Sequence, residues 1–265
     1  MVDARRPAAA GVFYPAERGL LVRTVRELLD AAASSSASQR PGRARAIVVP
    51  HGVLGPAGTV AAAGWARVVP HVTQVRRVVL LGPSHHVPFM GVAAPFADSF
   101  ATPIGLVEVD RVAIETARRF PQLVVTDLPH EQEPSLEVQL PFLQAVAPSA
   151  TIVPLVVGQV EDQETAQVID ALWNDQTLVV VSTDLSHYYD ATTAQKLDEG
   201  TARAVESLLP LPIGEDQACG HAALRGLLLV ARARSLHATR LLLRHSGEVT
   251  GDLTEVVGFG AFTID

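Results

Sequence analysis

Short apolar runs alternate with amphipathic stretches along this chain. Four runs are typical of strands buried on both faces, at residues 46–49, 77–81, 151–157 and 178–181. Apolar residues at helical spacing predict helices over 17–33, 58–69, 110–120, 135–146, 162–173, 192–208 and 220–234, with a polar serine-rich loop over 34–38. Two last runs, 239–244 and 255–264, predict a final strand pair at an antiparallel edge. This alternation predicts an α/β fold with a largely parallel central sheet flanked by helices.

Length and composition favour a single domain in a reducing compartment. A chain of 265 residues with 48% hydrophobic content can bury a single large core, so we expect one domain over residues 1–265. The single cysteine excludes an internal disulfide and fits a reducing compartment. Because no apolar stretch reaches the length of a membrane span and none follows the N-terminal charges, we expect a cytoplasmic protein without a membrane partner.

The charge balance makes a nucleic-acid partner improbable. The 21 basic and 28 acidic residues give a net charge of −7. Phosphate backbones are bound by clustered lysine and arginine, and the only visibly basic stretch, residues 40–45, carries three arginines in a loop. A solvent-exposed loop is the favoured interpretation of that stretch.

Polar side chains follow three of the predicted strands. His51 comes after the first strand, a histidine pair after the second, and Asp184 and His187 after the strand at 178–181. Ligands of open α/β sheets bind in the crevice outside the carboxyl ends of the strands. The sequence therefore predicts that these groups converge on one pocket.

Each group alone also has an ordinary structural explanation. A lone histidine such as His51 is more often a hydrogen-bonded structural residue than a ligand. Adjacent side chains of an extended segment point in opposite directions, so only one of His85 and His86 is expected to reach the pocket of His51. Asp184 either caps a helix or orients an imidazole, with His187 as acid or base, and this cluster alone does not decide between the two. Three clusters at corresponding strand ends favour a functional site.

Cys219 precedes the helix predicted at 220–234. A helix N-terminus lowers the pKa of a thiol, which favours a nucleophile or a metal ligand, although a free cysteine is more often a small buried hydrophobic residue. Two histidines and one cysteine suit iron(II), zinc or copper and leave a coordination position open. Their long spacing requires the fold to assemble the site.

Motifs along nearly the whole chain resemble the Memo-like family, whose prokaryotic members are called AmmeMemoRadiSam system protein B. The motifs that carry the resemblance are Ala9-Ala10-Gly11-Val12-Phe13-Tyr14-Pro15, Val49-Pro50-His51, Leu81-Gly82-Pro83-Ser84-His85-His86, Thr102-Pro103-Ile104-Gly105, Ser135-Leu136-Glu137-Val138-Gln139-Leu140-Pro141-Phe142-Leu143, Ser182-Thr183-Asp184-Leu185-Ser186-His187, Cys219-Gly220 and Val256-Val257-Gly258-Phe259. The histidine pair and the Ser-Leu-Glu-Val-Gln-Leu-Pro-Phe-Leu run are the most specific of these.

The resemblance implies a fold similar to that of the class III extradiol ring-cleavage dioxygenases. It implies a metal site at His51, His86 and Cys219, with iron as the first candidate and copper or zinc as alternatives. Asp184 and His187 would be pocket residues, with His85 in support. The prokaryotic family name also implies radical-SAM and AMMECR-type partner proteins.

Three departures from the family pattern affect the expected substrate contacts. Gly52 and Val53 follow His51, where the family usually continues with Ala-Gly-Tyr, so an aromatic hydroxyl is missing. Pro134 replaces a common histidine, although His130 remains nearby, and His221 replaces an arginine after Cys219-Gly220. Substrate contacts are therefore expected from His85, His130 and His221.

Two functions from different classes follow from these residues. In the first, the protein is a metal-dependent, dioxygenase-like oxidoreductase in which His187 moves protons and Asp184 tunes the site; in a variant, the Cys219 thiolate is a nucleophile without metal. In the second, the same pocket is a non-catalytic recognition site for a peptide or partner protein, with histidines binding an anionic group. Stoichiometric metal discriminates between the two.

Overall fold

The computed structural model describes residues 3–34 and 42–265. Most of the predicted serine-rich loop (35–38) and the start of the basic stretch (40–41) lie outside these ranges. The helices are α1 (Arg18–Ala33), α2 (Leu54–Ala66), α3 (Arg111–Ala117), α4 (Pro134–Glu137), α5 (Leu140–Val146), α6 (Asp162–Leu172), α7 (Ala191–Glu206), α8 (His221–Ala233) and α9 (Gly247–Thr250). The strands are β1 (Ala4–Arg5), β2 (Ala46–Val49), β3 (Arg77–Pro83), β4 (Val92–Ala94), β5 (Ser99–Thr102), β6 (Gly105–Glu108), β7 (Leu123–Val125), β8 (Thr151–Val157), β9 (Thr177–Ser182), β10 (His187–Tyr189), β11 (Ala238–His245) and β12 (Val256–Ile264).

A nine-stranded mixed sheet forms the centre of the fold. Its order is β10-β12-β2-β9-β3-β8-β4-β7, with β11 also paired to β12. The four middle strands, β2, β9, β3 and β8, are mutually parallel, and nearly all of their residues are buried because helices cover both faces. The parallel centre and the antiparallel β11–β12 pair are confirmed.

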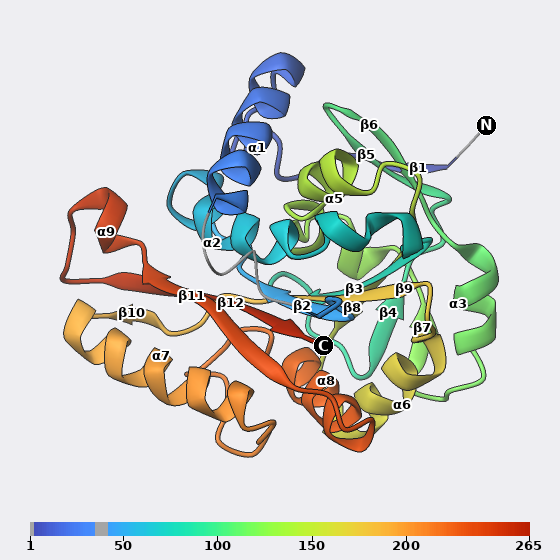
Figure 1. Ribbon diagram of the computed structural model, residues 1–265. Helices are drawn as coiled ribbons and strands as arrows, with labels where there is room; N and C mark the ends of the chain where they lie inside the picture. The colour runs from blue at the N-terminus through green and yellow to red at the C-terminus, as the bar shows by residue number, and fades with distance from the viewer. Residues whose placement is uncertain (1–2, 35–41) are drawn as a thin grey trace.

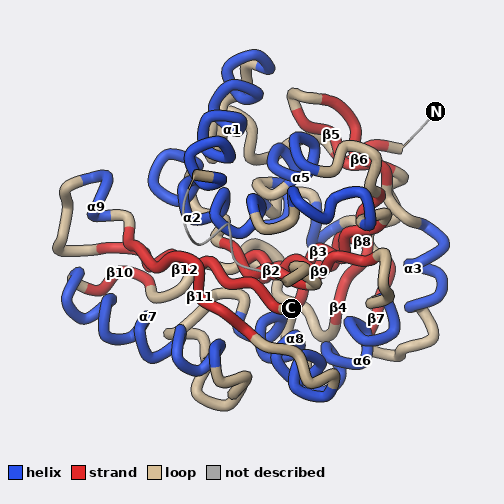
Figure 2. Tube along the Cα trace, viewed as in Figure 1, coloured by secondary structure: helices blue, strands red, loops and turns tan. Residues whose placement is uncertain are grey.

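Helices cover the two faces of the sheet in separate groups. Figure 1 shows α1, α2 and α5 on one face and α6, α7 and α8 on the other, with α3 beside the far edge. The same layers are visible in Figure 2, where the red strands run between two blue groups. The structure is thus an α/β single domain with a large mixed sheet flanked by helices. No helix within the described residues is both long and apolar enough to cross a bilayer.

Two predicted helices differ most from the structure. The helix predicted over 58–69 begins earlier, at Leu54, because Pro56 lies in its first turn, where a proline is tolerated. The single helix predicted over 135–146 is two helices, α4 and α5. Gln139 lies between them, and its buried side chain binds other elements of the fold.

The sequence pattern did not predict several short strands. β4, β5, β6, β7 and β10 have only three or four residues each, too few for a periodicity to be recognised. β1, β5 and β6 form a separate three-stranded sheet. β10 forms part of the candidate site described next.

Candidate metal centre

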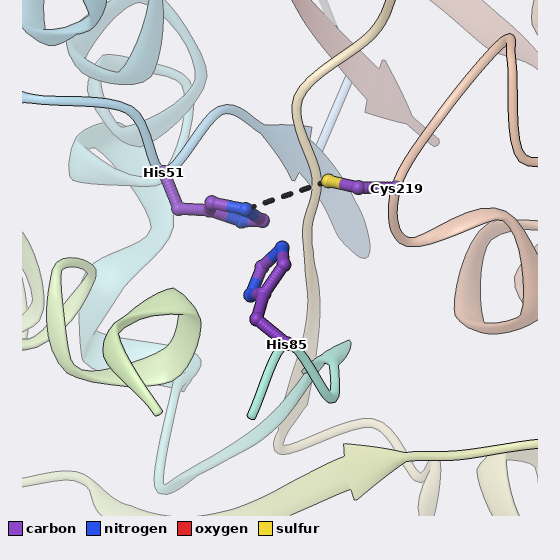
Figure 3. Close-up of side chains that lie close together, drawn as sticks. All are labelled: His51, His85 and Cys219. Carbon is purple, nitrogen blue, oxygen red and sulfur yellow. Dashed lines mark hydrogen bonds between the residues drawn. The ribbon is translucent and has the colours of Figure 1, made fainter. Parts of the chain in front are cut away.

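Two imidazoles and a thiol converge at one edge of the central sheet. One donor atom from each of His51, His85 and Cys219 lies within 4.8 Å of the others. Figure 3 shows the two rings and the sulfur directed toward a common space, with Nε2 of His51 3.5 Å from Sγ of Cys219. A tetrahedral ion bonded to nitrogen at about 2.1 Å and sulfur at about 2.3 Å holds the two atoms about 3.6 Å apart. The His51–Cys219 spacing therefore suits a shared ion.

The parallel strands bring these residues together. His51 lies just after β2 and His85 just after β3, and both strands are neighbours of β9. Cys219 lies two residues before α8, and its sulfur accepts a hydrogen bond from the backbone N–H of Asp184, which follows β9 (3.3 Å). The site thus lies at the carboxyl ends of the parallel strands, as the sequence predicted.

A buried hydrogen-bond network fixes the tautomer of His51. The hydroxyl of Ser182 donates to the carbonyl of Ser135 (2.7 Å) and accepts from Nε2 of Gln139 (2.9 Å). The single hydroxyl hydrogen of Ser182 is thus already donated to Ser135. The hydroxyl oxygen can therefore only accept a hydrogen bond from Nδ1 of His51, which lies 3.3 Å away. Nδ1 therefore carries a proton, and Nε2, which faces Cys219, is the nitrogen that a metal would take.

Glu133 orients His85 in the same way. This carboxylate is 2% exposed; it accepts hydrogen bonds from the backbone N–H of His85 (2.7 Å), from its Nδ1 (2.8 Å) and from the N–H of Ser135 (3.0 Å). Burial alone would raise the pKa of Glu133, but His85 outweighs it and lowers the pKa to about 2. The carboxylate–imidazole pair leaves Nε2 of His85 for ligation, an arrangement common in metal sites.

The substitution Glu133→Gln is expected to weaken metal binding about 10–100-fold. Glutamine has one acceptor oxygen where glutamate has two. Its NH2 group must therefore face one of the two His85 N–H groups, the backbone or the ring. A chelator competition titration at fixed pH measures the dissociation constant. Glu131→Gln is the matched control, because Glu131 lies two residues away and is exposed. Equal affinities of the two variants would refute a supporting role for Glu133.

The three converging groups stabilise charge in one another. Burial alone would raise the pKa of the Cys219 thiol, but His51 and His85 lower it to about 6. Burial alone would lower the pKa of His51, but Asp184 and Cys219 outweigh it and raise the pKa to about 9. Burial alone would also lower the pKa of His85, but Cys219 and Glu133 outweigh it and raise the pKa to about 10. Near neutral pH the metal-free site therefore holds a thiolate beside imidazolium.

Asp184 connects the loops that carry two of the donors. Its Oδ1 accepts from the backbone N–H groups of His51 (2.8 Å) and Gly52 (3.1 Å). Its Oδ2 lies 3.9 Å from Nε2 of His51. Asp184 therefore holds the His51 turn in place and adds a negative charge beside the three donors.

The three donors line a pocket of about 600 Å³, a volume typical of small-molecule sites. The predicted residues Asp184 and His187 also line it. The remaining lining residues are Phe13, His86, Pro134, Tyr188, Tyr189, Glu215 and Asp216. Pro134, which stands where the family pattern commonly has histidine, therefore forms apolar wall.

The third donor differs from the one chosen by sequence. His86 was expected beside His51 and Cys219, and the structure places His85 there. The reason is Glu133, which binds both the backbone and the ring of His85 and turns that ring edge-on to His51, with centroids 5.2 Å apart. His86 is an exposed residue of the pocket wall.

Two of the predicted substrate contacts lie outside this pocket. His130 is 1% exposed; its Nε2 lies 3.1 Å from the carbonyl of Ala93, its ring meets Phe100, and it is not among the pocket-lining residues. Burial lowers the pKa of His130 to about 4, as for a neutral core residue. His221 begins α8 and lines an adjacent cavity of about 490 Å³, which shares Cys219 and Glu215 with the first.

Sequence reasoning missed the residues that orient the imidazoles. Glu133, Gln139 and Ser182 are buried, and each is next to or within a motif already recognised. The available signal was a polar residue inside an apolar run, as with Gln139 before Leu140-Pro141-Phe142-Leu143. A buried polar side chain requires partners, and Trp65, Pro50 and Ser182 supply them for Gln139.

Comparisons with known proteins agree with the motifs. Residues 5–263 match the model of the Memo-like protein family. A MEMO1 family protein of Aquifex aeolicus is 32% identical over 273 residues, covering 96% of this chain and 97% of the relative. One from Methanosarcina barkeri is 29% identical, covering 98% of this chain and all of the relative.

A solved structure supports the fold alone. An uncharacterized protein of Escherichia coli K12 superposes with a TM-score of 0.51 at 12% identity, covering 83% of this chain and all of that chain. Because the family match and the relatives extend over nearly the whole sequence, this chain belongs to the Memo-like family.

Proposed function

We propose that this protein binds a non-haem metal ion through His51, His85 and Cys219 and acts as a metal-dependent oxidoreductase with dioxygenase-like chemistry. The observation that carries the proposal is the convergence of two imidazole nitrogens and a thiol in the lining of one pocket. Both Nδ1 atoms are occupied by Ser182 and Glu133, so the free nitrogens face the space between the donors. This is the donor arrangement that a bound ion needs.

The donor set limits the choice of metal. Imidazole suits iron, copper and zinc, and a thiolate favours softer ions over magnesium or calcium. Iron is the first choice, with copper or zinc as alternatives. A redox metal held here would supply an open coordination position and exchange electrons with a substrate in the pocket.

The residues around the donors would do the remaining work. His187 lines the pocket and begins β10, so its imidazole can accept or donate a proton to a bound molecule. Asp184 fixes the His51 turn through two backbone hydrogen bonds. Phe13 and Pro134 contribute apolar wall that limits water near the donors.

A recognition site for a peptide or partner protein is the alternative, and its predicted anionic ligand fits poorly here. The pocket lining contains Asp184, Glu215 and Asp216 and no lysine or arginine. Once a metal occupies the donors and the imidazoles are neutral, these carboxylates repel an anionic group unless the metal itself binds it. Association with radical-SAM and AMMECR-type proteins stays a prediction from the family resemblance.

Metal analysis of protein purified without a histidine tag tests the proposal. We expect one ion per chain, and an apparent affinity that rises by at least about tenfold per pH unit between pH 6.5 and 8.5. The sign follows from the pKa values: the Cys219 thiol ionises near pH 6, whereas His51 and His85 keep protons to about 9 and 10, and the metal must displace them. Affinity therefore increases as those protons are lost.

The measurement is a chelator competition titration at three pH values, run with iron(II) under anaerobic conditions and with zinc. Substoichiometric binding of every metal would reject the proposal. An affinity independent of pH would show that the bound ion does not displace these protons and lies elsewhere.

A further inference from the structure

Tyr188 is held at the mouth of the pocket by a bulge in β10. His187 pairs with Val257 and Tyr189 with Val256, so Tyr188 is an extra residue between two consecutive partners. Its φ is +62°, an uncommon conformation for a bulky side chain, and bulges of this kind re-aim a side chain beside functional sites. The ring is edge-on to His187, with centroids 5.7 Å apart, and the residue is 73% exposed. The fold thus places an exposed aromatic ring in the pocket lining, beside His187.

The same mouth carries uncompensated negative charge. Glu215 and Asp216 both line the pocket and are exposed, and within residues 3–34 and 42–265 neither side chain forms an ion pair. The charge of a divalent ion bound by the three donors would be balanced by the Cys219 thiolate and Asp184, because coordinating imidazoles are neutral. The pocket lining contains no lysine or arginine to pair with these two carboxylates.

We propose that the pocket binds a small molecule that joins a cationic amine to a flat apolar group. Glu215 and Asp216 would attract the amine, and Tyr188 would hold the cation or the flat group against its ring. A pocket of about 600 Å³ accommodates a molecule of this size but not a folded partner. This inference rests on the proposed function, because the pocket is the one that the proposed metal donors line.

A matched pair of probes tests the charge preference. 2-Phenylethylamine and 3-phenylpropionate have similar size and the same ring, with an ammonium in one and a carboxylate in the other. Calorimetric or NMR titration at pH 7.5 is performed on the zinc-loaded and on the metal-free protein. We expect the amine to bind at least about tenfold more tightly in both forms, because the mouth carboxylates are present in each.

Variants locate the preference on the named residues. The double variant Glu215→Gln/Asp216→Asn should weaken amine binding about fivefold to tenfold. Glu108→Gln/Glu115→Gln is the charge-matched control, since both residues are exposed and outside the pocket lining. Tyr188→Ala should weaken amine binding about threefold, and Tyr188→Phe should restore it.

Three results would overturn the proposal. They are carboxylate binding as tight as amine binding, failure of both probes to bind at about 10 mM, where the binding free energy would be weaker than about −3 kcal/mol, and equal losses in the pocket and control double variants. The proposed function fails separately, if no metal binds. If the unmodified protein binds no metal and still prefers the amine, this inference stands and the metal proposal is rejected.

Discussion

Replacement of His85 by alanine is expected to abolish stoichiometric metal binding, whereas the same replacement at the adjacent His86 leaves it intact. His85 supplies one of the three converging donors, and its loss leaves only His51 and Cys219. We expect an affinity loss of more than about 100-fold, since even the loss of a residue that supports a ligand costs about 10–100-fold. His86 lines the pocket but is not one of the three converging donors, so its removal deletes none of them.

The comparison is sharp because the two substitutions are chemically identical and one residue apart. Metal content after dialysis and the dissociation constant from chelator competition are measured for both variants. Circular dichroism and thermal unfolding show whether each variant is folded. If His86→Ala loses metal and His85→Ala keeps it, the ligand set predicted from the sequence is correct and the geometric set is wrong.

The exchange of His85 for His86 shows where sequence reasoning stops. The alternation of side chains along an extended segment predicted that one of the two histidines reaches His51, but not which one. The choice depends on Glu133, which is 48 residues from His85 in sequence and binds its backbone and its ring. No local pattern encodes a contact across that separation.

The central sheet was predictable for the opposite reason. Strands β2 and β8 match their predicted bounds because each is a run of apolar residues that burial on both faces requires. The break between α4 and α5 was not predicted, although Pro141 gives a local cause because it has no N–H to donate to the carbonyl of Glu137; the partners of Gln139 at the break, which are Trp65, Pro50 and Ser182, are tertiary. The location of the site follows from local pattern, and its hydrogen bonds follow from the fold.

The substitution Glu137→Gln is expected to lower the free energy of unfolding by about 3–5 kcal/mol. Glu137 is fully buried; it forms an ion pair with Arg5 and accepts hydrogen bonds from the N–H groups of Ala8 (2.7 Å) and Ala9 (2.9 Å) and from the hydroxyl of Tyr14. The neutral amide leaves the buried Arg5 guanidinium without its counter-charge and offers one acceptor oxygen in place of two. Denaturant unfolding followed by circular dichroism measures the change.

A double-mutant cycle separates the ion pair from the other contacts of Glu137. Arg5→Met/Glu137→Gln should be less destabilised than the sum of the two single variants, because the uncompensated cation is removed. Glu115→Gln, which breaks an exposed ion pair with Arg118, should change stability by less than about 1 kcal/mol. A loss at Glu137 no larger than this control would mean that water or another group replaces the carboxylate. Arg5 also donates to the carbonyl of Glu133 (2.7 Å), so the same buried cation joins the N-terminal segment to the residue that orients His85.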